Sequence, residues 1–410
     1  MKRRVVVTGM SGVTAFGNDW QSVEPKLRAC ENATQYMQSY EQYNGLNTKL
    51  AAPIDDFELP KHYTRKKIRG MGRVSLLSTV ASENALKQSG LLECEALTDG
   101  QTGIAYGSST GSTSAVGAFG VMLNEKDTKA ITATTYVQMM PHTAAVNVGL
   151  FFGLRGRVIP TSSACTSGSQ AIGYAYEAIK HGYQTAMVAG GAEELCPTES
   201  AVFDTLFATS LRNHDPKSTP RPYDIDRDGL VIGEGAATFV LEEYEHALAR
   251  GATIYAEIVG FASNCDAAHV TQPQKETMQL CMEMALKDAD LPPQAIGYIS
   301  AHGTATDKGD IAETNATAEI FGDNAPISSL KSYLGHTLGA CGAIEAWLSI
   351  EMMRSGWFCP TLNLDKLDER CGNLDYIRGT GREIDCQYLM SNNFAFGGIN
   401  TSIIFKRWQD

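Results

Sequence analysis

Hydrophobic and polar residues fall in blocks along the chain that predict strands alternating with helices. An apolar strand is predicted over 5–7, an amphipathic helix over 169–180, and further strands over 185–190 and 254–260. Buried strands that alternate with helices are typical of βαβ units and largely parallel sheets. We therefore expect an α/β protein.

The same pattern occurs twice. Ala-Leu-Lys at 85–87 and a strand-like run at 103–107 resemble Ala-Leu-Lys at 285–287 and the run at 297–301. Gly168 to Gly182 and Gly342 to Gly356 each frame a helix of the same length. With 410 residues the chain also exceeds what one small core needs. We interpret it as two similar α/β halves, 1–250 and 251–410.

Composition excludes several classes of protein. No apolar run approaches the roughly 18 residues of a membrane span, and the three valines near the start are too few for a signal peptide. We therefore expect a cytoplasmic protein without a membrane span. The ten cysteines include no CxxC pair and no zinc-type spacing. Reduced thiols and no bound metal are predicted.

Charge points away from nucleic acids but leaves one segment open. The net charge is −12, which argues against nucleic-acid binding. One stretch of thirteen residues is nevertheless strongly basic; it contains Lys61, His62, Arg65, Lys66, Lys67, Arg69 and Arg73. This segment is either a solvated helix face or a docking patch for an acidic partner, since a local basic field can steer association.

The best candidate for a nucleophile is Cys165. It follows the strand-like run at 158–161 and precedes the predicted helix, within Ser-Ser-Ala-Cys-Thr-Ser-Gly. The positive end of a helix favours thiolate and lowers the pKa of a cysteine placed there. Its small neighbours leave room for a substrate to reach the sulfur.

Two histidines are candidate partners for this thiol. His302 and His336 are each flanked by glycine and each follow a strand-like run in the second half. Neutral imidazoles can polarise a carbonyl or move a proton. Lys331 is either a structural cation that pairs with Glu345 or an electrostatic group of the same site.

Two further motifs are less convincing. Gly107 to Gly111 matches the GxSxG of serine hydrolases, which would make Ser109 the nucleophile, but 112–117 does not look like the helix that should follow. The run at 5–12 resembles a dinucleotide-binding loop, yet no acidic residue ends a second strand at the required distance.

Taken together, these motifs resemble β-ketoacyl-acyl-carrier-protein synthases of the elongating, Cys-His-His type. The resemblance extends over essentially the whole chain and rests on SSACTSG at 162–168, VAGGAEE at 188–194, RPYDIDRDGLVIGEGA at 221–236, AHGTATD at 301–307, LKSYLGHTLGACGAIEA at 330–346 and NNFAFGGIN at 392–400. It implies the thiolase fold, a five-layered αβαβα arrangement of two related halves. It argues against thiolases, which use a second cysteine where this chain has Asn393 to Phe396, and against initiating synthases, which use Cys-His-Asn. A non-catalytic chain-length subunit is the alternative of another class, and the complete Cys-His-His set argues against it.

The resemblance implies a decarboxylative Claisen condensation in fatty acid or related type II biosynthesis. Cys165 would take an acyl chain from the 4'-phosphopantetheine of an acyl-carrier protein, with no other cofactor. His302 and His336 would then stabilise the enolate that malonyl-carrier protein forms when it loses CO2. Backbone N–H groups of Cys165 and Phe396 would form the oxyanion hole, and Phe396 would gate the site.

The remaining roles are likewise implied by the resemblance. Lys331 would act with Glu345 and Asp310 in ordering the site, and Thr304 and Thr306 would hold the pantetheine arm. The acyl pocket would be lined by Thr110, Leu230 and Phe394. The acidic carrier protein would dock on Lys61, Arg65, Lys66, Lys67, Arg69 and Arg212, and the enzyme would form a homodimer or a heterodimer with a related ketosynthase-like subunit.

The chain also departs from the family pattern around the gate and the pocket. Ala395 stands where a glycine usually precedes the gating Phe396, and Leu230 replaces a phenylalanine. No catalytic group is lost by these changes. They favour an unusual acyl substrate, so a dedicated polyketide or aryl polyene pathway competes with fatty acid elongation.

Overall fold

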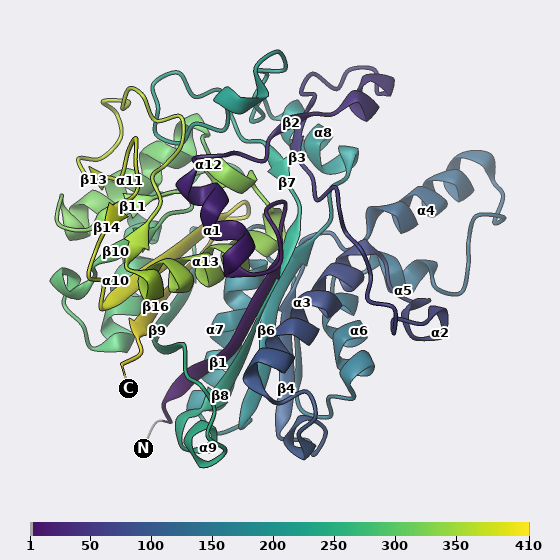
Figure 1. The fold of residues 1–410 in the computed structure, drawn as a ribbon. Helices are drawn as coiled ribbons and strands as arrows, with labels where there is room; N and C mark the ends of the chain where they lie inside the picture. Colours follow the sequence, from purple (N-terminus) through teal and green to yellow (C-terminus); the bar gives the residue numbers. More distant parts are fainter. Residues whose placement is uncertain (1–2, 410) are drawn as a thin grey trace.

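The computed structural model describes residues 3–409 and is built around a long mixed sheet (Figure 1). One group of strands comes from the first half of the chain, in the order β5 (Val158–Thr161), β4 (Thr102–Gly107), β6 (Ala186–Glu193), β8 (Gly235–Glu243) and β1 (Val5–Val13). The second group continues with β9 (Ala256–Cys265), β16 (Ile399–Arg407), β15 (Tyr388–Ala395), β10 (Tyr298–Ser300), β11 (Pro326–Ser328) and β13 (Asp375–Tyr376). Among residues 3–409, the two groups of strands are joined by a short pairing of Val5–Val7 with Ala256–Ile258.

Helices cover both outer faces and fill the space between the two groups. On one outer face α3 (Arg73–Ser89) and α6 (Thr143–Phe152) pack on the first group, and on the other α10 (Lys275–Ala289) packs on the second, beside α11 (Asp307–Phe321). Between them lie α7 (Ser167–Lys180) and α13 (Cys341–Ser355), which contact strands of both groups (Figure 1). This order of layers confirms the predicted five-layered α/β arrangement.

The central helices are almost entirely buried, and small residues let them approach the strands. Every residue of α13 from Cys341 to Met353 is buried. Trp347 lies against Gly12 of β1, where an added Cβ would stand 2.1 Å from the indole ring. A side chain at position 12 would therefore force the two elements apart, which explains why glycine is needed there.

The remaining elements complete the faces around this framework. They are α1 (Trp20–Arg28), β2 (Gln35–Tyr36), β3 (Leu50–Ala52), α2 (Arg65–Ile68), α4 (Thr113–Glu125), α5 (Thr135–Met139), α8 (Pro197–Thr205), β7 (Ile232–Gly233), α9 (Tyr244–Ala249), α12 (Lys331–Leu334), β12 (Trp357–Phe358) and β14 (Arg382–Glu383). Within residues 3–409, no helix combines the length and apolar character that a membrane crossing requires.

Two local expectations were wrong. The segment after Gly111 does form a helix, α4, although its glycines and mixed polarity disguised it. His336 does not follow a strand directly, because β11 ends at Ser328 and the short helix α12 comes between them.

Candidate active site

Cys165 lies in a tight turn between β5 and α7. The turn places Ala164 in the left-handed region, at φ 51°. The Ser167 hydroxyl closes it, because it donates to the Ala164 carbonyl at 2.7 Å and accepts the Ser163 N–H at 2.9 Å. These bonds hold the thiol, which is only 4 % exposed, above the first turn of a central helix.

The two predicted histidines lie next to this thiol. His336 Nε2 is 3.0 Å from Cys165 Sγ. The ring of His302 stands edge-on to that of His336, with 5.3 Å between their centroids. One ring nitrogen of each histidine and the sulfur all lie within 4.8 Å of one another. The structure thus brings together three residues that are far apart in sequence.

Hydrogen bonds fix which ring nitrogen of each histidine carries a proton. The Leu338 N–H donates to His336 Nδ1 at 3.2 Å, and the Lys331 ammonium, which can only donate, lies 3.2 Å from His302 Nδ1. Burial and the charge of Lys331 hold the pKa of both imidazoles well below their ordinary value, so both rings are neutral. Each therefore carries its proton on Nε2 and offers a donor to the site.

A buried ion pair stands behind the histidines. Lys331 forms a salt bridge with Glu345 of α13, and the two side chains are 2 % and 4 % exposed. Asn393 of β15 donates to the other Glu345 oxygen at 2.8 Å. Burial costs a lone charge so much that these groups must be paired. The pair in turn orients His302.

Burial, and not the terminus of α7, has the largest effect on the pKa of Cys165. Burial raises the pKa of the Cys165 thiol to about 11, although the Lys331 ammonium and the backbone N–H groups of Phe396 and Cys165 act in the opposite direction. Cys165 precedes the first residue of α7, Ser167, by two positions, so it lies outside the helix. Its sulfur is instead stabilised by donors that converge on it from other elements.

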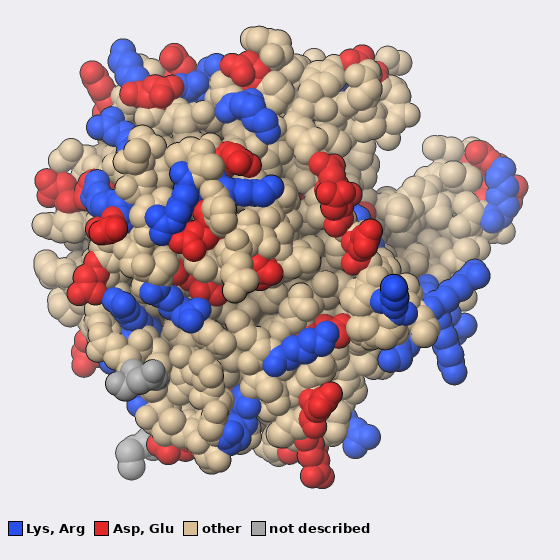
Figure 2. Space-filling view, in the orientation of Figure 1, with Lys and Arg blue, Asp and Glu red and all other residues tan. Residues whose placement is uncertain are grey.

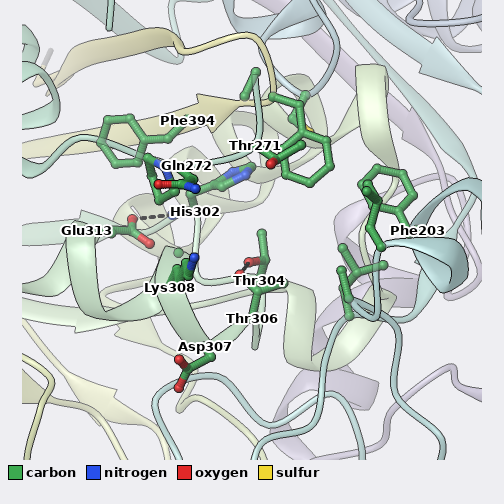
Figure 3. Close-up of a pocket in the computed structure, with 18 of the residues that line it drawn as sticks. Phe203, Thr271, Gln272, His302, Thr304, Thr306, Asp307, Lys308, Glu313 and Phe394 are labelled. Atoms are coloured by element: carbon green, nitrogen blue, oxygen red, sulfur yellow. Dashed lines mark hydrogen bonds between the residues drawn. The ribbon is translucent and has the colours of Figure 1, made fainter. Parts of the chain in front are cut away.

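These groups stand at the inner end of a cavity of about 420 Å³. Cys165, His302 and His336 line it, and so do the predicted residues Thr304, Thr306, Leu230, Phe394 and Phe396. Figure 3 shows Thr304 and Thr306 between His302 and Asp307, and their hydroxyls are 2.8 Å apart. The cavity is a channel with polar hydroxyls on one wall and the reactive groups at its end.

An aromatic pair narrows this channel beside the sulfur. Phe396 contacts Phe203 of α8, with the rings tilted by 34° and 5.2 Å between their centroids, and Leu230 belongs to the same apolar cluster. Gly397 and Gly398 follow at φ 88° and 73°, angles that glycine adopts without strain. Ala395 restricts the backbone before Phe396, whereas Gly397 and Gly398 leave the backbone after Phe396 more conformational freedom.

Family models match both halves of the chain. The model described as beta-ketoacyl synthase, N-terminal domain, covers residues 2–247, and the one described as beta-ketoacyl synthase, C-terminal domain, covers 255–365. The chain belongs to the beta-ketoacyl synthase family. This confirms the family predicted from the motifs, and with it the class of enzyme, an acyltransferase.

Several relatives are similar over their full length. The chain is 38 % identical to the 3-oxoacyl-[acyl-carrier-protein] synthase 2 of Vibrio harveyi, over 99 % of each chain, and 35 % identical to synthase 1 of Escherichia coli K12, over 100 % of each. A crystal structure of a beta-ketoacyl synthase from Burkholderia phymatum STM815 is 60 % identical, covers 100 % of both chains and has a TM-score of 0.98. The chain also matches a chain in a solved structure described as a type II PKS acyl-carrier protein in complex with its ketosynthase bound to the hexaketide. The two chains are 29 % identical over 100 % of each, with a TM-score of 0.89.

A pair of carboxylates, Asp310 and Glu313, orders the loop that carries His302 in this beta-ketoacyl synthase. Asp310 accepts the N–H groups of Tyr223 and Ala305 at 2.8 and 3.1 Å. Glu313 accepts those of His302 and Gly303 at 2.6 and 2.7 Å (Figure 3). Burial raises the pKa of Asp310 to about 6 and that of Glu313 to about 8. Sequence reasoning named Asp310 but missed Glu313, which the i, i+3 spacing on one helix could have revealed.

Two other residues of the site were also missed. The Cys341 thiol lies 3.2 Å from the Cys165 carbonyl oxygen, and Asn393 contacts both Glu345 and His302. Cys341 is one of ten cysteines with nothing in the sequence to distinguish it. Asn393 lies on a buried strand, where an asparagine is unusual enough to have been a signal.

Thr110 was expected in the acyl pocket but is absent from the residues that line the cavity. Its hydroxyl instead lies 3.0 Å from a Glu193 oxygen and 2.9 Å from a Glu199 oxygen. The neighbouring Ser109 hydroxyl is bound by Glu193 rather than by a histidine. The serine hydrolase alternative therefore lacks the histidine that its catalytic triad needs beside the nucleophile.

The predicted docking residues come from two segments of the chain, Lys61 to Arg69 and Arg212. Arg65, Lys66 and Lys67 are exposed on α2, which lies on the side of the molecule that carries α4, α5 and α6 (Figure 1). Arg212 is 3.6 Å from Asp228, which lines the cavity. Figure 2 shows Lys and Arg side chains, in blue, gathered on the side of α2, below the part of the molecule that carries α4.

Proposed function

We propose that this chain is a 3-oxoacyl-[acyl-carrier-protein] synthase that extends an acyl chain by decarboxylative condensation. The observation that carries the proposal is the convergence of the Cys165 thiol with two neutral Nε2–H donors at the end of a channel. A nucleophile and a pair of donors in one buried place suit thioester chemistry, in which negative charge develops on a carbonyl oxygen.

The first half-reaction loads the enzyme. Cys165 Sγ attacks the carbonyl carbon of the incoming acyl thioester, and the pantetheine sulfur leaves with the thiol proton. The backbone N–H groups of Cys165 and Phe396, which both point at the sulfur, are placed to bind the oxyanion formed in this step. The product is an acyl group on Cys165.

The second half-reaction forms the carbon–carbon bond. The malonyl carboxylate departs as CO2, and its bonding electrons form an enolate whose oxygen accepts hydrogen bonds from His302 and His336. The enolate carbon then attacks the acyl-Cys165 carbonyl, and the sulfur is released. The 3-oxoacyl group leaves on the carrier protein, two carbons longer than the acyl group that was loaded.

The proposal extends to the organisation of the chain and its partners. Residues 1–250 supply the nucleophile, and 251–410 supply the histidines and the gating loop. The enzyme works in the cytoplasm. It needs no prosthetic group of its own, because its substrates arrive on the 4'-phosphopantetheine of an acyl-carrier protein. Val158 of β5, one of the two terminal strands of the described sheet, is 47 % exposed, and such an edge pairs readily with a second subunit. We expect a homodimer or a heterodimer, which light scattering after size exclusion tests.

A dedicated polyketide or aryl polyene ketosynthase is the second candidate. Leu230 and Ala395 stand beside the gate, where they change the channel next to the acyl group. Mass spectrometry of products from purified protein, acyl-carrier protein and malonyl-carrier protein tests both candidates. Release of CO2 with a 3-oxoacyl product supports the condensation, and the preferred acyl chain separates the pathways; no product with any carrier would refute both.

A further inference from the structure

Two buried carboxyl groups that the proposed reaction does not use lie beside the turn that follows His336. Glu193 stands at the end of β6 and is 0 % exposed, and Glu199 in the first turn of α8 is 4 % exposed. Burial of a charge is costly unless hydrogen bonds or an opposite charge compensate it. The bonds that these two groups make therefore show which of them is ionised and what each one holds.

Glu193 joins two loops of the site. One of its oxygens accepts the N–H groups of Ser109 and Gly339 at 2.8 and 2.9 Å, and the other accepts the Ser108 hydroxyl at 2.8 Å. The two serines follow β4, whereas Gly339 belongs to the turn between His336 and α13. The carboxylate thus ties the turn that follows His336 to the central sheet.

The same turn sets the proton of His336. Leu338 donates its N–H to His336 Nδ1 at 3.2 Å, and this bond keeps the imidazole proton on Nε2. Leu338 has a φ of 47°, in the left-handed region that a bulky residue rarely adopts. A turn in such a conformation persists only when its surroundings hold it, and the N–H of the next residue, Gly339, donates to Glu193.

Close packing connects the turn to its neighbours without slack. An added Cβ at Gly191 of β6 would stand 2.5 Å from the Gly339 carbonyl oxygen, and one at Gly168 of α7 would stand 3.0 Å from it. The turn therefore lies directly on β6 and on the first turn of α7. A movement of Glu193 is passed to Gly339 and on to the imidazole of His336.

A single hydroxyl hydrogen shows that one of the two carboxyl groups is protonated. Thr110 Oγ1 lies 3.0 Å from a Glu193 oxygen and 2.9 Å from a Glu199 oxygen, yet a hydroxyl has only one hydrogen to donate. One of the carboxyl groups must therefore donate to Thr110. Glu193 accepts backbone N–H groups on both of its oxygens, which makes it the anion.

Glu199 is then the neutral acid. One of its oxygens donates to Thr110, and the other accepts the Cys196 N–H at 3.3 Å. Burial, together with the charge of Glu193, raises the pKa of Glu199 well above its ordinary value. Burial also raises the pKa of Glu193, but the hydrogen bonds from Ser109, Ser108 and Gly339 act in the opposite direction.

We propose that Glu193 is a positioning residue for His336. As a carboxylate it fixes the turn at Gly339, and the neutral Glu199 holds it in place through Thr110. Neither carboxyl group lines the channel, so each acts through other residues. This inference rests on the proposed function, because the imidazole that Glu193 positions is the donor assigned to the malonyl enolate.

The test compares two variants that separate position from charge. Glu193→Asp keeps the charge but shortens the side chain by one methylene, whereas Glu193→Gln keeps the length. In the glutamine variant the amide oxygen still accepts the N–H groups of Ser109 and Gly339, and the NH2 group faces hydroxyl groups that can turn to accept. Glu242→Asp is the matched control, because it shortens a carboxylate that is also 0 % exposed, at the opposite end of the pairing between β6 and β8.

Nitrogen NMR of labelled histidines and the rates of both half-reactions are measured for each variant. Glu193→Asp should move the His336 signal away from that of a neutral Nε2–H ring and leave the His302 signal in place. It should slow malonyl decarboxylation about tenfold at unchanged KM, because a misplacement of about 1 Å can cost up to about 10²-fold. Acyl loading should fall much less. Glu193→Gln should restore the wild-type His336 signal, and Glu242→Asp should leave that signal and the ratio of the half-reactions as they are.

The inference is overturned if Glu193→Asp changes neither the His336 signal nor the rate of decarboxylation. It is also overturned if Glu193→Gln is the more damaging variant, since charge and not position would then matter. An equal loss in both half-reactions with an unaltered His336 signal would reduce Glu193 to a structural role. If Glu193→Asp does not fold, Thr110→Val, which has nearly the wild-type shape, should move the same signal, and an unmoved signal there overturns the inference.

Infrared spectroscopy tests the proton on Glu199. Wild type at neutral pH should show a C=O band of a protonated carboxylic acid that Glu199→Gln lacks, and identical spectra would overturn this assignment. If wild type releases no CO2 from malonyl-carrier protein, the proposed function fails, whereas the His336 signal still decides whether Glu193 positions the ring.

Discussion

Replacing His302 by alanine should separate the two half-reactions. The ring offers one Nε2–H to the site, since the Lys331 ammonium is hydrogen-bonded to its other nitrogen. Alanine removes that donor and leaves the Cys165–His336 contact, at 3.0 Å, in place. Loss of one oxyanion donor typically costs about 2.7–4 kcal/mol. Malonyl decarboxylation should therefore slow by a factor of about 10² to 10³.

Acyl transfer to Cys165 should be affected much less by the same change. In that step the oxyanion is bound by the backbone N–H groups of Cys165 and Phe396, which the substitution leaves intact. Decarboxylation is followed as labelled CO2 released from malonyl-carrier protein, and transfer as the mass of the acyl-enzyme. His181→Ala, at an exposed histidine remote from the channel lining, is the control.

The reasoning is refuted if His302→Ala decarboxylates at nearly the wild-type rate. It is also refuted if both half-reactions fall by the same factor in a protein that still unfolds like wild type. The first result would show that the Nε2–H does not bind the enolate oxygen. The second would show that His302 acts on the thiol and not on the malonyl group.

Three further predictions test neighbouring parts of the site. Lys331→Met should slow alkylation of Cys165 by iodoacetamide at pH 8, because the Lys331 ammonium lowers the thiol pKa; an unchanged rate would contradict this. Nitrogen NMR of labelled histidines should show His302 and His336 as neutral Nε2–H rings down to pH 6, since their pKa values are depressed; imidazolium signals at pH 6 would count against the assigned tautomers. Ala395→Gly should broaden the range of accepted acyl chains, because the gate limits access. The measurement is kcat/KM across a series of acyl-chain lengths, and an unaltered series would contradict this role of the gate.

Most of the fold, and the residues proposed for the active site, could be predicted from local signals. The periodicity of the chain placed β6, β9 and α7 within a few residues of their observed bounds, and the glycine-framed repeat identified the two central helices. Cys165 and the two histidines could be proposed because each stands among small residues at an element boundary. Such positions can be recognised from neighbours in sequence alone.

What could not be predicted depends on contacts between distant segments. The pKa of Cys165 is set by burial and by Lys331, 166 positions away along the chain, so the local argument from the helix terminus had the wrong sign. Glu313 acts through the backbone of another loop, and α2 lies on the side of the molecule that carries α4, α5 and α6. A cluster of basic residues in sequence says nothing about the face on which the fold places it.

The most direct test of the central claim is intact-mass analysis of acyl loading, followed by peptide mapping. The purified enzyme is mixed with acyl-carrier protein, and malonyl-carrier protein is added afterwards. The account predicts one acyl adduct on Cys165, its loss in Cys165→Ala, and its conversion to a 3-oxoacyl-carrier protein with release of CO2. An adduct on another residue, such as Cys341, or an adduct that malonyl-carrier protein does not discharge, would contradict it.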